Sequence, residues 1–250
     1  MKLSNLRPIQ TGGAQIPTYF DELIAWIDHL PAWFTISAIP RPKATLLCGL
    51  PGVGKCSAAK VIARTLNRPL YRLDPCCRLS EAISQLTTKK TRCVLWVDRP
   101  GEIHFALHRW LLDDSPDVFV VFTTDAPHGL PPGFTRADVV SSVWHLELPT
   151  LPQRSGLWGE LLSAAIPGYH EHDSVKLGQL TPLWTPAEVH AAFDVALRAS
   201  GSTPDSGALV DAVLALKPLA PSMDEHLAFL RQWAHQNARP ASSRSACREM

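Results

Sequence analysis

The chain of 250 residues is 46% hydrophobic, enough to bury a core in one large domain or two small ones. Its 24 lysines and arginines balance 23 aspartates and glutamates, so the net charge of +1 provides no basic surface, and we expect no nucleic-acid partner. No apolar run of about 18 residues occurs and the chain starts without an apolar signal segment, so we expect a cytoplasmic protein with no membrane contact. The six cysteines lack C-x-x-C spacing, and we expect neither disulfides nor zinc.

The elements expected along the chain are a helix, a set of buried strands and then further helices. Residues 19–27 read as one amphipathic helix that precedes the first strand. Short apolar runs then alternate with helical stretches, a pattern typical of a parallel sheet covered by helices. The predicted strands are 44–48, 70–73, 93–97, 118–123 and 143–148. After Pro149 the apolar residues recur only at helical spacing.

A glycine-rich loop follows the first predicted strand. Residues 49–56 read Gly-Leu-Pro-Gly-Val-Gly-Lys-Cys and match G-x-x-x-x-G-K between a strand and a helix-compatible stretch. Backbone N–H groups of such a loop surround phosphate oxygens, and the lysine adds a positive charge. The residues expected to bind ATP or ADP are Gly49, Pro51, Gly52, Val53, Gly54, Lys55, Cys56 and Ser57. The alternative is a glycine-rich turn that binds nothing.

Two positions that usually serve magnesium binding and water activation are altered. The eighth loop position is Cys56 instead of Ser or Thr, and a thiol is a poor ligand for magnesium, while Ser57 is turned about 100° away along the helix. Asp98, at the end of the third predicted strand, is expected to hold magnesium weakly through water. Many such ATPases next have a glutamate that activates water, but here Arg99 follows. Glu102 is one candidate substitute; the alternative is a solvated loop carboxylate.

The predicted fold class is α/β, a five-stranded parallel P-loop NTPase sandwich followed by a small all-helical lid domain. Residues 1–42 are expected to form a lead helix and linker, 43–150 the nucleotide-binding core, 151–238 the helical lid and 239–250 a flexible tail. The strand before the phosphate loop is expected to be central. Nucleotide is expected between core and lid, at the carboxyl ends of the strands.

With these motifs in this order, the chain resembles the AAA family of P-loop ATPases, and more narrowly a subgroup known from chloroplast-encoded and cyanobacterial open reading frames. The likeness covers most of the chain. It follows the subgroup's order and spacing at residues 42–47, 68–74, 93–98, 118–124 and 130–149. Residues 230–242 resemble the end of the subgroup's lid. Members usually carry a further N-terminal region, which this chain is expected to lack.

The resemblance also implies roles for individual residues. Asp125 falls where the family has a sensor asparagine near the γ-phosphate, so a charge replaces a neutral amide. Arg136 and Val139 fall at the two subunit-interface arginines, which leaves Arg136 as the finger that would act on a neighbouring subunit. Residues 185–189 resemble the start of the sensor-two helix, with Pro186 where glycine is usual. No aromatic pore loop is recognisable in residues 75–92, so threading of protein substrates is not expected.

These observations predict an AAA-family protein that binds ATP or ADP with impaired or absent hydrolysis and serves as a nucleotide-responsive regulatory or structural subunit of an oligomer. Asp98, Asp125 and Arg136 are the expected catalytic residues, with magnesium as a weakly held cation. One alternative is a slow but genuine AAA ATPase that remodels a protein partner, with its base from Glu102, Asp125 or an adjoining subunit. The other is a nucleotide-free interaction module. The partner, the oligomer size and the occurrence of hydrolysis stay open.

Overall fold

The computed structural model describes residues 6–36, 41–73, 79–88, 92–100, 107, 109–111, 117–131, 137–165, 171–201 and 203–243. The chain divides into two compact units, and each is described by itself. The first unit comprises Met1–Gly49, Lys55–Leu146 and Phe229–Ser242, and the second comprises Leu50–Gly54, Glu147–Ala228 and Ser243–Met250. The central residues of the phosphate loop therefore group with the second unit.

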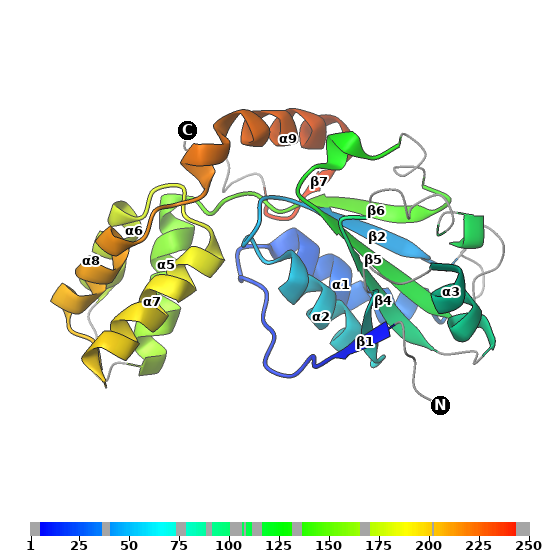
Figure 1. Ribbon diagram of the computed structural model, residues 1–250, viewed down its shortest axis with the longest axis horizontal. Helices are drawn as coiled ribbons and strands as arrows, with labels where there is room; N and C mark the ends of the chain where they lie inside the picture. Colours follow the sequence, from blue (N-terminus) through cyan, green and yellow to red (C-terminus); the bar gives the residue numbers. More distant parts are fainter. Residues whose placement is uncertain are drawn as a thin grey trace. The chain divides into compact units, whose positions relative to one another are not determined.

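A seven-stranded sheet in the order β1-β3-β4-β5-β2-β6-β7 forms the centre of the first unit (Figure 1). The strands are β1 (Leu6–Ile9), β2 (Ala44–Cys48), β3 (Leu70–Leu73), β4 (Cys93–Asp98), β5 (Val118–Thr124), β6 (Val140–His145) and β7 (Arg239–Pro240). β1 pairs antiparallel with β3, and the other neighbours pair in parallel. The predicted α/β class with a parallel sheet is confirmed.

The five predicted strands all form, because their apolar runs are buried on both faces of the sheet. Every residue of β2 and of β5 is buried, as expected for parallel strands covered by helices. β2 is an interior strand, flanked by β5 and β6. β6 runs over Val140–His145 instead of the predicted 143–148. Its apolar run continues past the strand end, where Leu146 and Leu148 are buried outside the strand.

Two edge strands are absent from the sequence prediction. In β1, Arg7 and Pro8 interrupt the apolar residues, and β7 has only two residues, so neither shows a recognisable apolar pattern. After β7, the Ala241 N–H donates to the His145 carbonyl over 2.9 Å, and the Leu23 N–H donates to the Ala241 carbonyl over 3.1 Å. Residues 239–242 thus pair with the first unit, although the sequence placed the start of a flexible tail at residue 239.

Helices cover both faces of this sheet. α1 (Asp21–Trp33) and α2 (Lys55–Thr65) lie on one face, where the rings of Trp26 and Trp144 are 5.7 Å apart (Figure 1). On the other face, α3 (Leu79–Thr88) contributes Ala82 and Leu86 to the main apolar cluster of the sheet. The C-terminal part of α9 (Asp224–Asn237) also belongs to this unit, and Trp233 packs against the same cluster.

The second unit is helical. It contains α5 (Leu151–Ala165), α6 (Glu171–Leu180), α7 (Pro186–Ser200) and α8 (Ser206–Ala215), the bundle coloured from light green to orange in Figure 1. α5 packs on α6 and α7, while α8 packs on α6 and α7. Trp158 is fully buried and donates to Thr181 over 3.3 Å. Across the described residues of both units, no helix has the length and apolar character needed to cross a membrane.

Candidate functional site

The loop between β2 and α2 has the backbone shape of a phosphate loop. Its start is held by the Gly49 N–H, which donates to the Thr124 carbonyl at the end of β5 over 3.2 Å. Gly52 and Gly54 have φ of 89° and 111°, a region that strongly favours glycine. The side chains of Leu50 and Val53 are buried and anchor the loop. α2 begins at Lys55, so the positive end of this helix faces the loop.

Lys55 is the charged group of this loop. Its ammonium Nζ donates to the Gly49 carbonyl oxygen over 2.6 Å. Burial lowers the pKa of Lys55 from 10.5 to about 8, against the opposing effect of the negative charges of Asp125 and Asp98. A partly buried ammonium group at the start of a helix and beside a glycine-rich loop is well suited to contact an anion such as a phosphate.

Asp98 and Thr123 are brought together by strand register at the carboxyl edge of the sheet. The two residues are direct partners in the β4–β5 pair. The Thr123 hydroxyl donates to Asp98 Oδ1 over 2.7 Å and accepts from Trp96 Nε1 over 2.9 Å. The second carboxylate oxygen, Oδ2, accepts from Arg72 Nη2 over 3.2 Å. Both oxygens of Asp98 are therefore occupied by side chains of the sheet.

Cys56 occupies the first turn of α2, where a hydroxyl would normally contact magnesium. Burial raises the pKa of the half-buried Cys56 thiol, with Lys60 and Arg72 acting in the opposite direction. The group is therefore a neutral thiol at pH 7, which is a poorer magnesium ligand than a hydroxyl. Among the described residues, no cluster of three or more His, Cys, Asp or Glu side chains is arranged to hold a metal ion. A neutral thiol at position 56 and an Asp98 carboxylate already hydrogen-bonded to Arg72 and Thr123 are a poor fit for a magnesium ion.

Arg99 follows Asp98 at the position where a water-activating glutamate is usual. It is exposed, it has a φ of 47°, and its N–H donates to the Thr123 carbonyl over 2.7 Å. A guanidinium stays protonated at neutral pH and has no acceptor atom, so it does not accept a proton from water. Glu102, the candidate substitute, lies outside the described residues.

The family resemblance also implied roles for Asp125, Val139 and Arg136, and the structure describes the first two. Asp125 follows β5, and its charge is the strongest one acting on Lys55. Val139 is buried in the apolar cluster of the sheet, so its side chain is not displayed to a neighbouring subunit. Arg136 lies outside the described residues.

Within the second unit, the middle of the phosphate loop contacts the start of α7. The Ala187 N–H donates to the Gly52 carbonyl oxygen over 3.1 Å. Thr185 caps α7 in a capping box, since its hydroxyl accepts from the Glu188 N–H while Glu188 accepts from the Thr185 N–H. The second Glu188 oxygen accepts from the Leu219 N–H over 2.7 Å. The segment that resembles the sensor-two helix start thus directly touches the loop backbone.

Sequence reasoning missed Arg72 and Thr123 as residues of this site. A signal for Arg72 existed, because it is the one cation in the four-residue strand Leu70–Leu73. Its pairing with Asp98 depends on β3 and β4 being neighbours, which the sequence alone does not show. For Thr123 the sequence indicated only a position in a buried strand and gave no signal of a contact with Asp98.

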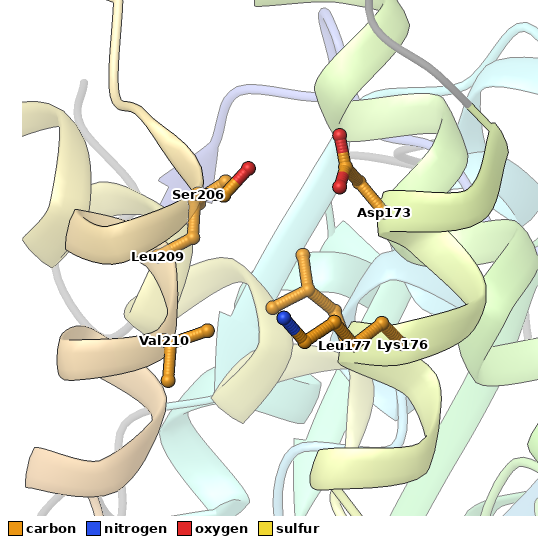
Figure 2. Close-up of a pocket in the computed structure, with 6 residues that line it drawn as sticks. All are labelled: Asp173, Lys176, Leu177, Ser206, Leu209 and Val210. Atoms are coloured by element: carbon orange, nitrogen blue, oxygen red, sulfur yellow. The ribbon is translucent and has the colours of Figure 1, made fainter.

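A small hollow lies between α6 and α8 of the second unit (Figure 2). It is lined by Asp173, Lys176, Leu177, Ser206, Leu209 and Val210 and has a volume of about 10 Å³. A single water molecule needs about that much space. This hollow is too small for a nucleotide or a comparable substrate.

Comparison with known proteins supports the reading of the phosphate loop. The sequence is 27% identical over 226 residues to an uncharacterized AAA domain-containing protein, ycf46, of Pyropia yezoensis, an alignment that covers 78% of this chain and 46% of the relative. The ycf46 proteins of Trieres chinensis and Guillardia theta are 27% and 26% identical over 249 residues, covering 86% of this chain and 50% and 49% of theirs. The chain spans about half the length of the curated relatives it matches. No family model matches the sequence.

The fold also matches solved structures. The crystal structure of the FIGL-1 AAA domain superposes with a TM-score of 0.67 at 16% identity, covering 95% of this chain and 90% of that domain. The same domain in complex with ADP gives a TM-score of 0.62 at 17% identity, with coverage of 88% and 87%. The chain therefore has the fold of an AAA domain, and its resemblance to the plastid-encoded AAA subgroup is confirmed.

Proposed function

We propose that this protein binds ATP or ADP through the loop Gly49–Cys56 and hydrolyses ATP very slowly or not at all. The observation that carries the proposal is the phosphate-loop backbone, with Gly52 and Gly54 at positive φ and the Lys55 ammonium group hydrogen-bonded to the Gly49 carbonyl. The ADP-bound FIGL-1 AAA domain has a similar fold, which supports nucleotide as the ligand class. The phosphates of a bound nucleotide would lie beside the Lys55 ammonium group and the positive end of α2.

Impaired hydrolysis follows from the groups beside Asp98. Arg99 replaces the usual base, and both oxygens of Asp98 already accept hydrogen bonds from Thr123 and Arg72. Loss of a single positioned catalytic group commonly lowers turnover by about 10²–10³-fold. A protein with these changes is suited to hold nucleotide without consuming it. Its contacts with other subunits could then depend on whether nucleotide is bound, as in a regulatory or structural subunit.

The role as a subunit of an oligomer and the cytoplasmic location remain part of this proposal. Arg136 is the residue that would act on a neighbouring nucleotide site. The partner would be a protein, or further copies of this chain.

A slow but genuine ATPase is the second candidate function. It is favoured by Asp125, a carboxylate at the end of β5 whose charge acts on Lys55. In that case Asp125 would take the proton of the attacking water. Replacement of Asp125 by Asn would then abolish phosphate release and leave nucleotide affinity largely intact.

The test is calorimetric titration of ATP and ADP on the purified chain, with phosphate release measured in the same samples. We expect binding with phosphate release below about 0.1 s⁻¹, roughly 100-fold under a typical enzyme turnover. The variant Lys55→Ala should weaken binding at least about tenfold. Lys176→Ala, in the second unit, is the control and should bind like the natural protein.

Two outcomes would contradict the proposal. Steady phosphate release above that limit would select the ATPase candidate, and its loss in Asp125→Asn would identify the base. Absence of binding in both the natural protein and Lys176→Ala would leave the nucleotide-free interaction module.

A further inference from the structure

The guanidinium of Arg72 is directed to the carboxylate that ends the neighbouring strand. Arg72 and Trp96 are register partners in the β3–β4 pair, and the Arg72 guanidinium lies 4.8 Å from the centroid of the Trp96 ring. Its Nη2 lies 3.2 Å from Asp98 Oδ2. An aromatic face on one side and a carboxylate on the other hold the cation in one position.

Asp98 itself is oriented so that it cannot turn away from Arg72. The Trp96 indole N–H donates to the Thr123 oxygen, and the Thr123 hydroxyl donates its proton to Asp98 Oδ1, because a carboxylate oxygen only accepts. This chain of hydrogen bonds fixes one carboxylate oxygen and presents the other to Arg72. Side chains from β3, β4 and β5 therefore build one polar cluster, which we call the Arg72 cluster: Arg72, Trp96, Asp98 and Thr123.

The Arg72 cluster lies next to the start of the phosphate loop, because the Gly49 N–H donates to the carbonyl of Thr124, the residue that follows Thr123. The charges of Arg72 and Asp98 both act on the Cys56 thiol, and the charge of Asp98 also acts on Lys55. The side chains of Arg72 and Asp98 remain 38% and 25% exposed. The guanidinium group of Arg72 is therefore accessible to an anion from solvent.

Arg72 also has hydrogen-bonding capacity left over. A guanidinium has five N–H donors. One of them, on Nη2, donates to Asp98. Nε is buried without a hydrogen-bond partner among the described residues, so an anion that approaches from solvent would meet the Nη groups. Phosphate oxygens are the acceptors that a guanidinium fork matches best.

We propose that Arg72 takes the place of magnesium, so that the protein binds ATP and ADP in their metal-free form through Arg72 and Lys55. The inference rests on the proposed nucleotide binding. A magnesium ion at this kind of site needs a hydroxyl at position 56 and a carboxylate free to bind its water shell. This chain has a neutral thiol at the first position and a carboxylate already paired with a cation at the second. The same replacement accounts for slow hydrolysis, because a single fixed charge stabilises the developing negative charge less than a divalent ion does.

The primary experiment is titration of ADP and ATP into the natural protein in EDTA and in 5 mM Mg²⁺, both at roughly neutral pH. A magnesium-dependent site would bind nucleotide more tightly in Mg²⁺ than in EDTA. We expect affinity in EDTA that equals or exceeds affinity in Mg²⁺, because magnesium withdraws nucleotide into a complex for which the site has no place. Arg72→Gln should weaken binding in EDTA by about tenfold or more. Arg92→Gln is the matched control, since Arg92 forms an exposed ion pair with Asp117 at the other end of β4 and should bind normally.

The double variant Cys56→Ser/Arg72→Gln tests the replacement directly. It adds the missing hydroxyl and frees Asp98, so its affinity should become at least about tenfold weaker in EDTA than in Mg²⁺. Electron paramagnetic resonance with Mn²⁺ requires no variant. ADP should not increase the Mn²⁺ bound by the natural protein.

The outcomes separate this inference from the proposed function. Nucleotide binding that requires Mg²⁺, or ADP-dependent Mn²⁺ binding, would overturn the inference and leave the proposed function intact. Metal-free binding that survives in a folded Arg72→Gln would also overturn it. Should Arg72→Gln fail to fold, Arg72→Lys keeps the charge but loses the fork, and unchanged metal-free affinity in that variant would count against Arg72. Absence of binding with and without Mg²⁺ would reject the proposed function itself.

Discussion

The ammonium group of Lys55 donates a 2.6 Å hydrogen bond to the carbonyl oxygen of Gly49, the first residue of its own loop. The backbone of the loop therefore supplies a hydrogen-bond acceptor to this cation. Because burial still lowers the pKa of Lys55 to about 8, the charge of this residue changes within an accessible pH range.

Nucleotide affinity is expected to fall above pH 8. Bound phosphate favours the charged form and raises the pKa of Lys55, so binding between pH 8 and 10 takes up a proton. Affinity should then decrease with rising pH by up to about tenfold per pH unit. Titration calorimetry at pH 8.5 in buffers of different ionisation enthalpy measures this proton uptake.

Lys55→Arg is the matched control for that measurement. Arginine keeps its charge over the whole range, so this variant should bind without proton uptake and with a flat pH profile. A flat profile between pH 7 and 9.5 in the natural protein would contradict the role of Lys55 as the group that titrates.

Gly52→Ala is expected to destabilise the second unit. A Cβ at this position would lie 2.7 Å from Thr185 Oγ1, and the φ of 89° disfavours any side chain. The substitution should lower the free energy of unfolding by about 1–3 kcal/mol. Thermal and urea unfolding followed by circular dichroism measure the change.

Gly156→Ala serves as the comparison for Gly52. Gly156 lies exposed in α5, and a Cβ there meets no atom within 4 Å. Alanine should therefore stabilise the helix by about 0.5–1 kcal/mol. Equal effects of the two substitutions would show that the contact between the loop and Thr185 has no energetic weight.

Arg154 is a buried cation whose contacts lie within the helical unit. It donates through Nη1 to the Pro149 carbonyl over 2.6 Å and through Nε and Nη2 to the Gly178 carbonyl over 3.3 Å. Arg154→Met would leave both carbonyl groups without these donors and should cost about 2–3 kcal/mol of unfolding free energy. Arg198→Met, at an exposed position of α7, should change it by less than about 0.5 kcal/mol. Similar urea midpoints for the two variants would contradict a structural role for Arg154.

Arg99→Gly is expected to stabilise the first unit. Arg99 has a φ of 47°, a left-handed conformation that costs a residue with a Cβ about 1–2 kcal/mol. Glycine adopts it freely, and after its own larger entropy loss the net gain should be about 0.5–1 kcal/mol. Asn67→Gly, at a φ of 50°, should gain less because asparagine tolerates this region better than arginine. A loss of stability in Arg99→Gly would show that the Arg99 side chain makes a stabilising contact.

The sequence by itself determined the elements whose signal lies within one short, continuous run of residues. The runs 44–48 and 70–73 form strands at those same residues. Every residue of 44–48 is buried, as an apolar run in an interior parallel strand should be, while 70–73 buries Leu70 and Leu73. The phosphate loop was equally readable, since its glycines and Lys55 act through the backbone of one short segment.

Tertiary structure alone decided the edge strands and the partners of Asp98. β1 contains Arg7 and Pro8 and β7 has only two residues, so neither shows an apolar pattern, and they exist because β3 and β6 offer unpaired edges. Arg72 and Thr123 reach Asp98 from 26 and 25 residues away. Such contacts depend on which strands are neighbours and in what register, and strand order is set by the packing of the whole sheet instead of by any local run of residues.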